Sequence, residues 1–332
     1  MSEADKTPGP SPLRPMSAHN NLHGVLFNAT SAEYHALTIQ CYQLARHALL
    51  ERLAEGTFLN PAVVMDLDET VLDNSPYQAW LVASGHNFHE AASWDPWCAL
   101  GEAGAVPGAV EFVRFARAHD VEVLFITSRR NATRLGTARN LHLLGLLTDK
   151  EYEAEVEAAG SAAHAMTTRL FMKGMPPVDA ERPFGLTTYD LNNKFQQRQF
   201  CEEVRGYEVA LSIGDNLADW AEYYGTVFDN EGKPVDKMHP TAESRLQLAV
   251  QDSQLFGRDF ILLPNATYGG WMRAFEVQNI GASDELAYTA EPVREPLHEP
   301  QEEFRFEGGA KAAKAVQAKL LASKKLRIWK GP

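Results

Sequence analysis

Short apolar runs alternate with amphipathic stretches between residues 58 and 273. This alternation is typical of a parallel α/β sheet, in which helices connect buried strands. Each apolar run is four to six residues long and most of them end in a polar residue, which favours strands whose carboxyl ends carry a functional site. The predicted strands are Pro61–Met65, Val121–Ile126, Arg169–Met172 and Glu208–Ile213.

A helix is predicted upstream of the first strand, from about Ser31 to Leu53, because apolar residues recur there at helical spacing. Ser31, with Glu33 and Tyr34 behind it, suits a helix start. The recurring apolar positions are Leu37, Cys41, Leu44 and Ala48.

Both ends of the chain differ from this central region in composition. Residues 1–22 are polar and rich in proline, which predicts a disordered leader. Residues 280–309 carry an excess of acids and several prolines, which predicts an extended linker, whereas residues 310–332 carry seven bases and no acid and are expected to form a helix. Such a basic tail can dock onto a membrane or an acidic partner, but we favour a solvated helix that folds back towards the acidic linker.

Composition and charge narrow the class of protein. The 332 residues are 45% hydrophobic and 23% charged, so the chain can bury a sizeable core. Its 31 basic and 44 acidic residues give a net charge of −13, which argues against binding to a nucleic acid polymer or to an anionic membrane. No apolar run is long enough to span a bilayer, and the first residues lack an apolar signal stretch and a Cys for lipidation. We therefore expect a cytoplasmic chain as written, with no transmembrane segment.

The most informative motif is residues 63–70, in which the first predicted strand runs into two carboxylates, Asp66 and Asp68. Residues i and i+2 of a strand face the same side, so the two side chains can converge just beyond the strand end. Burying two acids together is costly unless a cation or a proton compensates them. The pair therefore favours a chemical site over the alternative of an acidic surface loop.

Three further segments carry polar groups that suit the same site. Asp215 and Asp219 follow the fourth predicted strand and share a face if a helix begins there. Thr127 and Ser128 follow the second strand with hydroxyls that can hydrogen-bond an anionic oxygen, and Lys194 lies between the third and fourth strands. Each signal is weak alone, but their order along the chain is informative.

The order of acid pair, Thr, Lys and second acid pair resembles the haloacid dehalogenase (HAD) superfamily of phosphotransferases. The longer motifs are similar to those of the class C acid phosphatases, also known as the bacterial outer-membrane-lipoprotein acid phosphatase and 5′-nucleotidase family. The resemblance covers about residues 25–273 and rests on residues 31–34, 66–77, 94–97, 107–112, 214–217 and 263–271. It implies a doubly wound, Rossmann-like α/β core of residues 58–72 plus 107–273, with a small, mainly helical cap of residues 25–57 plus 73–106.

The resemblance also implies a role for each residue of the catalytic site. Asp66 would attack phosphorus and become an aspartyl-phosphate, and Asp68 would act as the general acid and base. Thr127 would donate a hydrogen bond to a phosphoryl oxygen, and Lys194 would balance charge on the phosphate and on Asp66. Because a carboxyl group must be protonated before it can protonate a leaving alkoxide, we expect an acidic pH optimum.

The family pattern further implies a magnesium site. Its ligands would be the Asp66 carboxylate, the Asp68 backbone carbonyl and Asp215, with Asp219 close by in support. Mg²⁺ suits such a site because it takes hard oxygen ligands and neutralises charge before a carboxylate attacks a phosphoryl dianion.

Trp94, Tyr268 and Ser128 are the expected substrate-binding residues. Trp94 and Tyr268 match positions where the family places aromatic rings around the substrate's base, with core packing as the alternative for each. Ser128 stands where the family usually has Asn, and an additional stretch from Gly174 to Thr188 can reshape the rim of the pocket. The missing export signal is another departure, so an exported form with a different or processed start is the alternative to a cytoplasmic one.

We therefore expect an Mg²⁺-dependent acid phosphatase that hydrolyses small phosphomonoesters, in the first place nucleoside 5′-monophosphates. A phosphatase or phosphotransferase acting on sugar phosphates or other small phosphoesters is the enzymatic alternative. A non-catalytic binding or storage protein on the same fold is the alternative of another class, although it would be expected to have lost some of the acids that are present here. Family members often pair, so a homodimer is an open possibility.

Overall fold

The computed structural model describes residues 21–84, 91–157, 165–182, 185–229, 231, 233–235, 238–280, 328–329 and 331. The leader predicted for residues 1–22, the acidic linker and the basic tail lie almost entirely outside these described residues. Within the described part of the chain, no helix is both long enough and apolar enough to cross a membrane.

A five-stranded sheet forms the centre of the molecule, with the strand order β5-β4-β1-β8-β9. All four of its pairings are parallel. The chain builds the sheet outward from β1 in one direction and then returns to add β8 and β9 on the other side, so β1 lies at the switch point of a doubly wound fold. The strands are β1 (Pro61–Met65), β4 (Glu122–Arg130), β5 (Leu170–Lys173), β8 (Glu208–Gly214) and β9 (Phe260–Leu262).

The four strands predicted from the sequence are therefore confirmed, and two differences are instructive. Strand β4 runs four residues beyond the predicted end at Ile126, although its register with β5 shifts between Thr127 and Arg130. Strand β9 was not predicted, because it is only three residues long and lies at the edge of the sheet.

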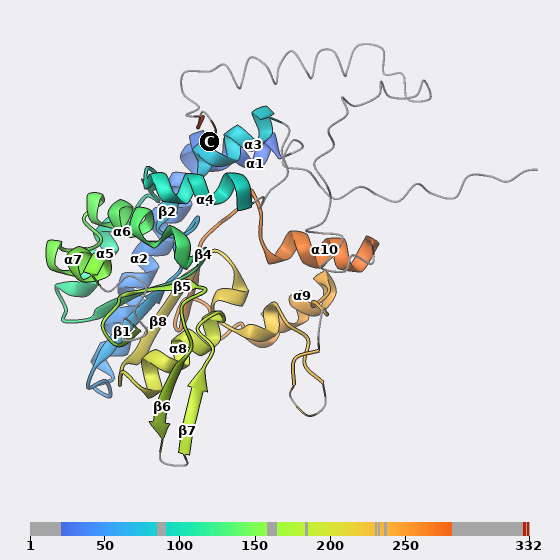
Figure 1. Cartoon of the computed structure of the whole chain (residues 1–332). Helices are drawn as coiled ribbons and strands as arrows, with labels where there is room; N and C mark the ends of the chain where they lie inside the picture. Colours follow the sequence, from blue (N-terminus) through green and yellow to red (C-terminus); the bar gives the residue numbers. More distant parts are fainter. Residues whose placement is uncertain are drawn as a thin grey trace, which may run out of the picture.

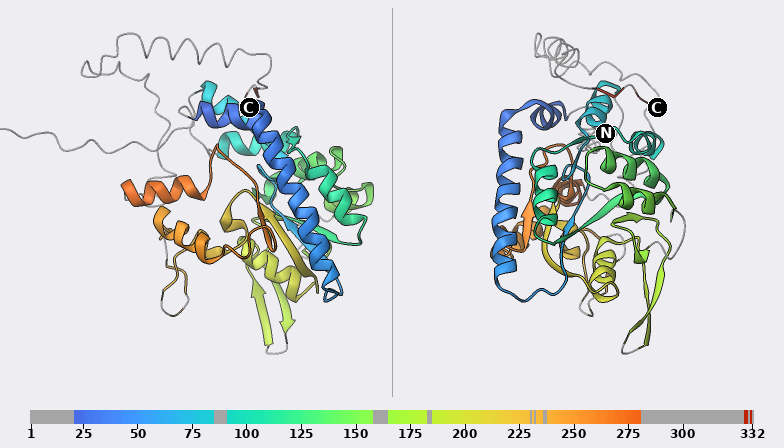
Figure 2. Two further views of the ribbon diagram at one scale, coloured as in Figure 1. Left: turned by 180° about the vertical axis from the view of Figure 1, so that it is seen from behind. Right: turned by 90° about the vertical axis from the view of Figure 1, so that its left-hand side faces the viewer.

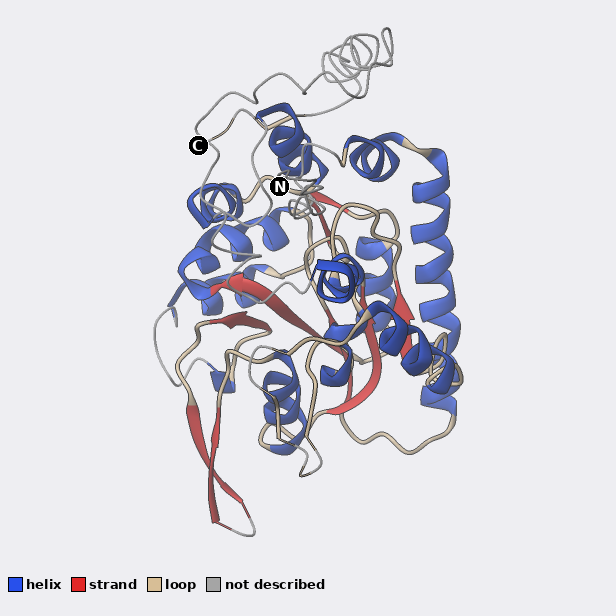
Figure 3. Ribbon diagram, turned by 90° about the vertical axis from the view of Figure 1, so that its right-hand side faces the viewer, coloured by secondary structure: helices blue, strands red, loops and turns tan. Residues whose placement is uncertain are grey.

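Helices lie on both sides of the central strands (Figure 3). The long helix α2 (Ala32–Ala54) packs against β8, β9 and helix α5 (Ala109–Arg117), as the side view in Figure 2 shows. Residues 25–57 were expected to belong to the cap, whereas α2 within that range lies along one face of the sheet. Helix α8 (Lys194–Glu203) packs against β4. The helices that follow β4 and β8 are α6 (Arg134–Leu143), α7 (Asp149–Glu157), α9 (Ala242–Gln251) and α10 (Gly270–Ile280).

Helix α2 begins as predicted, but only part of the predicted apolar stripe is buried. The Ser31 hydroxyl oxygen accepts a hydrogen bond from the Tyr34 backbone N–H, which is the capping contact expected of Ser at this position. Leu37 and Leu44, members of the predicted apolar stripe, are 40% and 47% exposed. Ala48 of that stripe is buried, together with Leu49 and with small or hydroxyl-bearing side chains that face the sheet and α5, namely Tyr34, Thr38, Tyr42 and Ala45.

Three short helices and a two-stranded ribbon cover the carboxyl end of the sheet (Figure 1). Apolar side chains between α1 and α3, among them Val25, Ala79 and Val82, form a small core separate from the main one around the sheet. A β6–β7 hairpin, formed within the additional stretch noted in the sequence, extends away from the sheet (Figure 1). These elements are α1 (Leu22–Thr30), α3 (Ser75–Ser84), α4 (Ala91–Leu100), β2 (Leu72–Asp73), β3 (Gly104–Ala105), β6 (Val178–Arg182) and β7 (Gly185–Tyr189).

Candidate active site

The carboxyl ends of β1, β4 and β8 bring the predicted site residues to one edge of the sheet. Met65, the last residue of β1, pairs with Phe125 on one side and with Ile213 on the other. Asp66 follows directly, and its backbone N–H donates a hydrogen bond of 2.9 Å to the carbonyl oxygen of Ile213. Asp66 is buried, with 7% of its surface exposed, because the strands on both sides continue past it.

Three carboxylates converge at this edge. Asp66, Asp215 and Asp219 each contribute one oxygen to a group of atoms that lie within 4.8 Å of one another. Asp219 reaches the group because residues 217–219 form a 3₁₀ turn. In that turn the Asn216 side chain accepts from the Ala218 N–H at 3.3 Å, and Asp219 Oδ2 accepts from the Asn216 N–H at 3.1 Å. The expectation that Asp215 and Asp219 share a face is met by this turn rather than by an α-helix.

Lys194 supplies the positive charge that faces these acids. It is the first residue of α8, and the Asn193 side chain caps that helix by accepting from the Phe195 N–H at 2.7 Å. The Lys194 ammonium lies 2.5 Å from Asp66 Oδ1 and 2.8 Å from Asp219 Oδ1. Burial alone would lower the pKa of Lys194, but the attraction of Asp219 and Asp66 outweighs it and raises the pKa.

One lysine does not balance three carboxylates, of which Asp66 is buried and Asp215 and Asp219 are half-buried. Burial raises the pKa of Asp66 to about 7. The positive charge of Lys194 opposes this rise, but the negative charges of Asp219 and Asp68 add to it, so Lys194 offsets it only in part. Burial and the charges of Asp219 and Asp66 likewise hold the pKa of Asp215 well above its usual range, despite a 2.7 Å hydrogen bond from Asn265 Nδ2 to Asp215 Oδ2. Convergent carboxylate oxygens with excess negative charge are a donor set that fits a divalent cation such as Mg²⁺.

The Asp68 side chain is held by a buried arginine that the sequence analysis did not identify. Arg129 is 1% exposed, and its Nε and Nη2 donate to Asp68 Oδ1 at 2.9 and 2.7 Å. Asn74 Nδ2 donates to the same oxygen at 2.9 Å, and the Asn74 Oδ1 accepts from the Trp97 indole N–H at 2.8 Å. The signal was available in the sequence, because Arg129 lies two residues after Thr127 and so shares its side of β4.

A second buried acid, Glu69, lies beside Asp68 and was also missed. Its backbone is left-handed, with φ of 57°, and its side chain is buried. The Asn74 backbone N–H donates to Glu69 Oε1 at 3.1 Å, and the Tyr268 hydroxyl donates to Glu69 Oε2. Burial, and next the nearby charge of Asp68, raise the pKa of Glu69 to about 8. Tyr268 thus reaches the acid motif from a segment 199 residues away.

The remaining expected residues are placed as follows. Trp94 is largely buried, its ring meets that of Tyr77 edge-to-face with centroids 4.9 Å apart, and the Arg129 guanidinium lies 5.5 Å from the Trp94 ring centre.

Thr127 is buried, and its hydroxyl oxygen accepts from the Arg129 N–H at 3.1 Å. Ser128 is exposed, because successive residues of β4 face opposite sides. Trp94 and Tyr268 therefore reach Arg129 and Glu69, the neighbours of Asp68, from separate segments of the chain.

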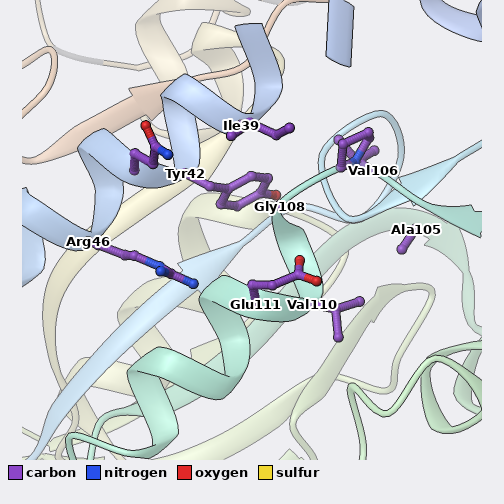
Figure 4. A pocket seen from close by; sticks show the side chains of 10 residues that line it. Ile39, Tyr42, Arg46, Ala105, Val106, Gly108, Val110 and Glu111 are labelled. Carbon is purple, nitrogen blue, oxygen red and sulfur yellow. The ribbon is translucent and has the colours of Figure 1, made fainter. Parts of the chain in front are cut away.

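A cavity of about 560 Å³ lies elsewhere, between α2 and the start of α5 (Figure 4). Its lining includes Ile39 and Arg46 on α2 and Val110 and Glu111 on α5, and Figure 4 shows the Tyr42 ring among them. None of the predicted site residues lines it, so it is separate from the acid cluster at the sheet edge.

Comparison with known proteins gives a family match and two matching solved structures. Residues 13–271 match the family model described as HAD superfamily, subfamily IIIB (acid phosphatase). The class C acid phosphatase from Bacillus anthracis with tungstate bound is 26% identical, with a TM-score of 0.59, and the match covers 84% of this chain and 99% of that one. Another structure of the Bacillus anthracis class C acid phosphatase has the same identity and coverage and a TM-score of 0.58.

Proposed function

The chain belongs to the acid phosphatases of HAD subfamily IIIB, and from that premise we propose that it hydrolyses small phosphomonoesters through a phosphoryl group carried on Asp66. Membership of this family makes it a phosphomonoester hydrolase, which argues against a non-catalytic storage protein. The observation that carries the proposal is the environment of Asp66: a buried carboxylate, paired with Lys194 and facing two further acids at the switch point of the sheet.

In the first step, Asp66 attacks the phosphorus of the substrate. A bond forms between a carboxylate oxygen of Asp66 and phosphorus while the bond from phosphorus to the ester oxygen breaks. Lys194 supports this step because its ammonium already lies against Asp66 and can stabilise the negative charge that develops on the phosphoryl oxygens. Thr127, buried at the neighbouring strand end, is the proposed hydroxyl donor to those oxygens.

Asp68 handles the protons of both steps. It donates a proton to the leaving alkoxide oxygen, and it then takes a proton from the water that attacks the phosphorylated Asp66. The second attack releases inorganic phosphate and restores the Asp66 carboxylate. Because Arg129 and Asn74 both donate to Asp68 Oδ1, we assign the exchanged proton to Oδ2.

Asp66, the Asp68 carbonyl and Asp215 would hold the divalent cation, for which we propose Mg²⁺. When bound, such a cation neutralises the charge of the phosphoryl group and of the acids around it. Asp219 is the supporting acid, because its oxygens are occupied by Lys194 and by the Asn216 N–H. Asn265 orients Asp215 through its hydrogen bond to Oδ2.

We propose nucleoside 5′-monophosphates as the substrate class, with Trp94 and Tyr268 as the rings that contact the base. The support is that the two aromatic side chains approach Asp68 from separate elements, through Arg129 and Glu69 respectively. A sugar phosphate would use the same phosphate site without the rings, and no contact in the described residues favours it.

Phosphate release from matched substrates tests this function. Wild-type protein and Asp66→Asn are assayed with adenosine 5′-monophosphate, ribose 5-phosphate and p-nitrophenyl phosphate, each with Mg²⁺ or with EDTA. We expect release by the wild type that depends on the cation, favours the nucleotide and is lost in Asp66→Asn. Release that survives in Asp66→Asn would contradict the assignment of the nucleophile.

A further inference from the structure

The carboxyl end of the chain lies against the helical cap beside α3 (Figures 1 and 2). The Trp329 backbone N–H donates a hydrogen bond of 3.0 Å to the carbonyl oxygen of Pro76. Ile328 packs against the small core of Val25, Ala79 and Val82. Two neighbouring residues of the terminus are therefore fixed to the cap by a backbone hydrogen bond and by apolar contact.

The Trp329 indole joins an aromatic cluster within the cap. Its ring centre lies 5.2 Å from that of Trp80, 5.7 Å from that of Trp97 and 5.9 Å from that of Tyr77. Gly331, with φ of 91°, passes so close to Trp80 that a Cβ there would lie 2.9 Å from the indole nitrogen. Aromatic rings at these separations attract one another beyond the effect of burial alone.

This cluster continues directly into the site. Trp97 is 2% exposed, and its indole N–H donates to Asn74 Oδ1, which also accepts from Arg129 Nη2 at 3.1 Å. Asn74 in turn donates to Asp68 Oδ1. Trp329 is thus separated from Asp68 by one indole and one amide, and its ring packs on the indole that fixes the amide.

Nothing in the family match accounts for this contact, because the matched region ends at residue 271. We propose that Trp329 is a positioning residue for Asp68, and that the carboxyl terminus acts as a clasp that holds Trp97 and Asn74 in the arrangement the general acid needs. This role rests on the proposed function of Asp68 as the acid and base. In this proposal, Trp329 influences catalysis by Asp68 although the two residues lie some 260 positions apart in the sequence.

The test compares Trp329→Ala with Trp329→Phe in the full-length protein, and Phe115→Ala serves as the matched control. Phe115 is a half-buried aromatic residue on α5 whose ring contacts His119 and Arg46 and packs against the main core. We measure kcat and KM with glycerol 3-phosphate, whose alkoxide must be protonated, and with p-nitrophenyl phosphate, whose nitrophenolate leaves without a proton. Hydrogen exchange of the α3 and α4 amides is followed in the same proteins.

We expect Trp329→Ala to lower kcat/KM for glycerol 3-phosphate by about tenfold, with a smaller loss of kcat/KM for p-nitrophenyl phosphate. This ratio reports the transfer of the phosphoryl group to Asp66, in which only the alkoxide needs the proton of Asp68, whereas kcat also includes the later hydrolysis, for which Asp68 is the base with both substrates. Trp329→Phe should retain most of the activity, and Phe115→Ala all of it. Faster amide exchange in α3 and α4 should accompany the loss in Trp329→Ala.

An unchanged or increased kcat/KM for glycerol 3-phosphate in Trp329→Ala, or an equal loss of kcat/KM with both substrates, would overturn the positioning role. Unchanged exchange in α3 and α4 would overturn the clasp itself. If the wild type released no phosphate from any substrate, the proposed function would fail, and with it the catalytic role of Trp329, while the exchange measurement would still decide whether the clasp exists.

Discussion

Arg129 holds a single oxygen of Asp68. Its Nε and Nη2 donate to Oδ1 at 2.9 and 2.7 Å, and Asn74 adds a third hydrogen bond to the same atom. Burial alone would lower the pKa of Arg129, but the carboxylate of Asp68 raises it, so the guanidinium stays charged inside the protein. We therefore assign different roles to the two oxygens of Asp68: Oδ1 is fixed by hydrogen bonds, and Oδ2 exchanges the proton.

The Arg129→Lys variant tests that division. A lysine keeps the charge but cannot supply two donors in the fixed geometry of a guanidinium, so Asp68 would lose its orientation. We expect kcat/KM, which reports the phosphoryl transfer to Asp66, to fall by about 10²-fold with an alkyl phosphate and by much less with p-nitrophenyl phosphate. Steady-state kinetics with the two substrates measure the ratio. The conservative variant is chosen because removing one partner of a buried ion pair costs about 3–5 kcal/mol of stability. Equal losses of kcat/KM with both substrates would argue that Arg129 acts on some other part of the site.

Lys194 is expected to matter for chemistry and not for cation binding. In Lys194→Met, kcat should fall by about 10²- to 10³-fold, because the charge that moves onto the phosphoryl oxygens loses its fixed partner. The same change leaves Asp66 and Asp219 without their counter-charge, so Mg²⁺ should bind at least as tightly as in the wild type. Isothermal titration with Mg²⁺ checks the second expectation. Weaker Mg²⁺ binding in Lys194→Met would show that the lysine helps to build the cation site.

Tyr268 has two proposed roles: its ring contacts the base of the substrate, and its hydroxyl donates a hydrogen bond to Glu69. Two variants separate these roles. Tyr268→Phe keeps the ring, so KM for a nucleotide should hold while the protein loses about 1–3 kcal/mol of stability, because the buried Glu69 loses a donor. Tyr268→Ala should also raise KM for adenosine 5′-monophosphate by about tenfold or more, since base stacking contributes roughly 1–3 kcal/mol.

Ribose 5-phosphate is the control substrate for Tyr268, because it carries the phosphate and sugar without the base. Its KM should be similar in Tyr268→Ala and Tyr268→Phe. A parallel rise for ribose 5-phosphate and the nucleotide in Tyr268→Ala would mean that the ring does not contact the base. Chemical denaturation supplies the stability comparison.

Stability without a cation should fall as the pH rises. Asp66 and Glu69 have pKa values of about 7 and about 8 in the folded protein, above their ordinary values of 3.8 and 4.5. Between these limits the folded protein binds protons that the unfolded chain has released, so raising the pH favours unfolding. A divalent cation replaces those protons at Asp66 and Asp215, so Mg²⁺ should raise the melting temperature more at pH 8 than at pH 5.

Thermal unfolding at both pH values, in EDTA and in Mg²⁺, measures this linkage. Asp215→Asn is the control, because it removes one carboxylate of the cluster and should abolish most of the Mg²⁺ response. A stabilisation by Mg²⁺ that is equal at the two pH values, or larger at pH 5, would contradict the competition between protons and the cation.

The central sheet could be predicted from the sequence because its strands are buried on both faces and read as apolar runs. The stretch from Ala62 to Met65 is buried in full, and the residues at which the runs end are the acids and hydroxyls of the site. Strand β9 gave no comparable signal, since three residues at a sheet edge are too few to set a pattern. The buried side of α2 was also misjudged. Thr38 and Ala45 are not large apolar residues, so they do not stand out in a search for an apolar stripe, yet both are buried.

The residues that hold the acids were harder to find than the acids themselves. Arg129, Asn74 and Glu69 are polar residues that sequence patterns place at the surface, and they are buried only because they satisfy one another. The contacts of Trp329 could not be predicted from the sequence, because its partners Pro76, Trp80 and Trp97 lie far away along the chain and such contacts produce no periodic pattern. Contacts between distant segments form only in the folded chain. They could be predicted here for the residues that match the family motifs, but not for Arg129, Asn74, Glu69 and Trp329.

The most direct test of the account is to trap the phosphoryl group on Asp66. In Asp68→Asn, p-nitrophenyl phosphate can still transfer its phosphoryl group because nitrophenolate needs no proton, but the water of the second step has lost its base. Acid quenching followed by mass spectrometry should then find one phosphoryl group on the peptide that contains Asp66, and none when Asp66→Asn is added. Turnover in Asp68→Asn without any covalent adduct, or an adduct on another residue, would contradict a reaction that passes through Asp66.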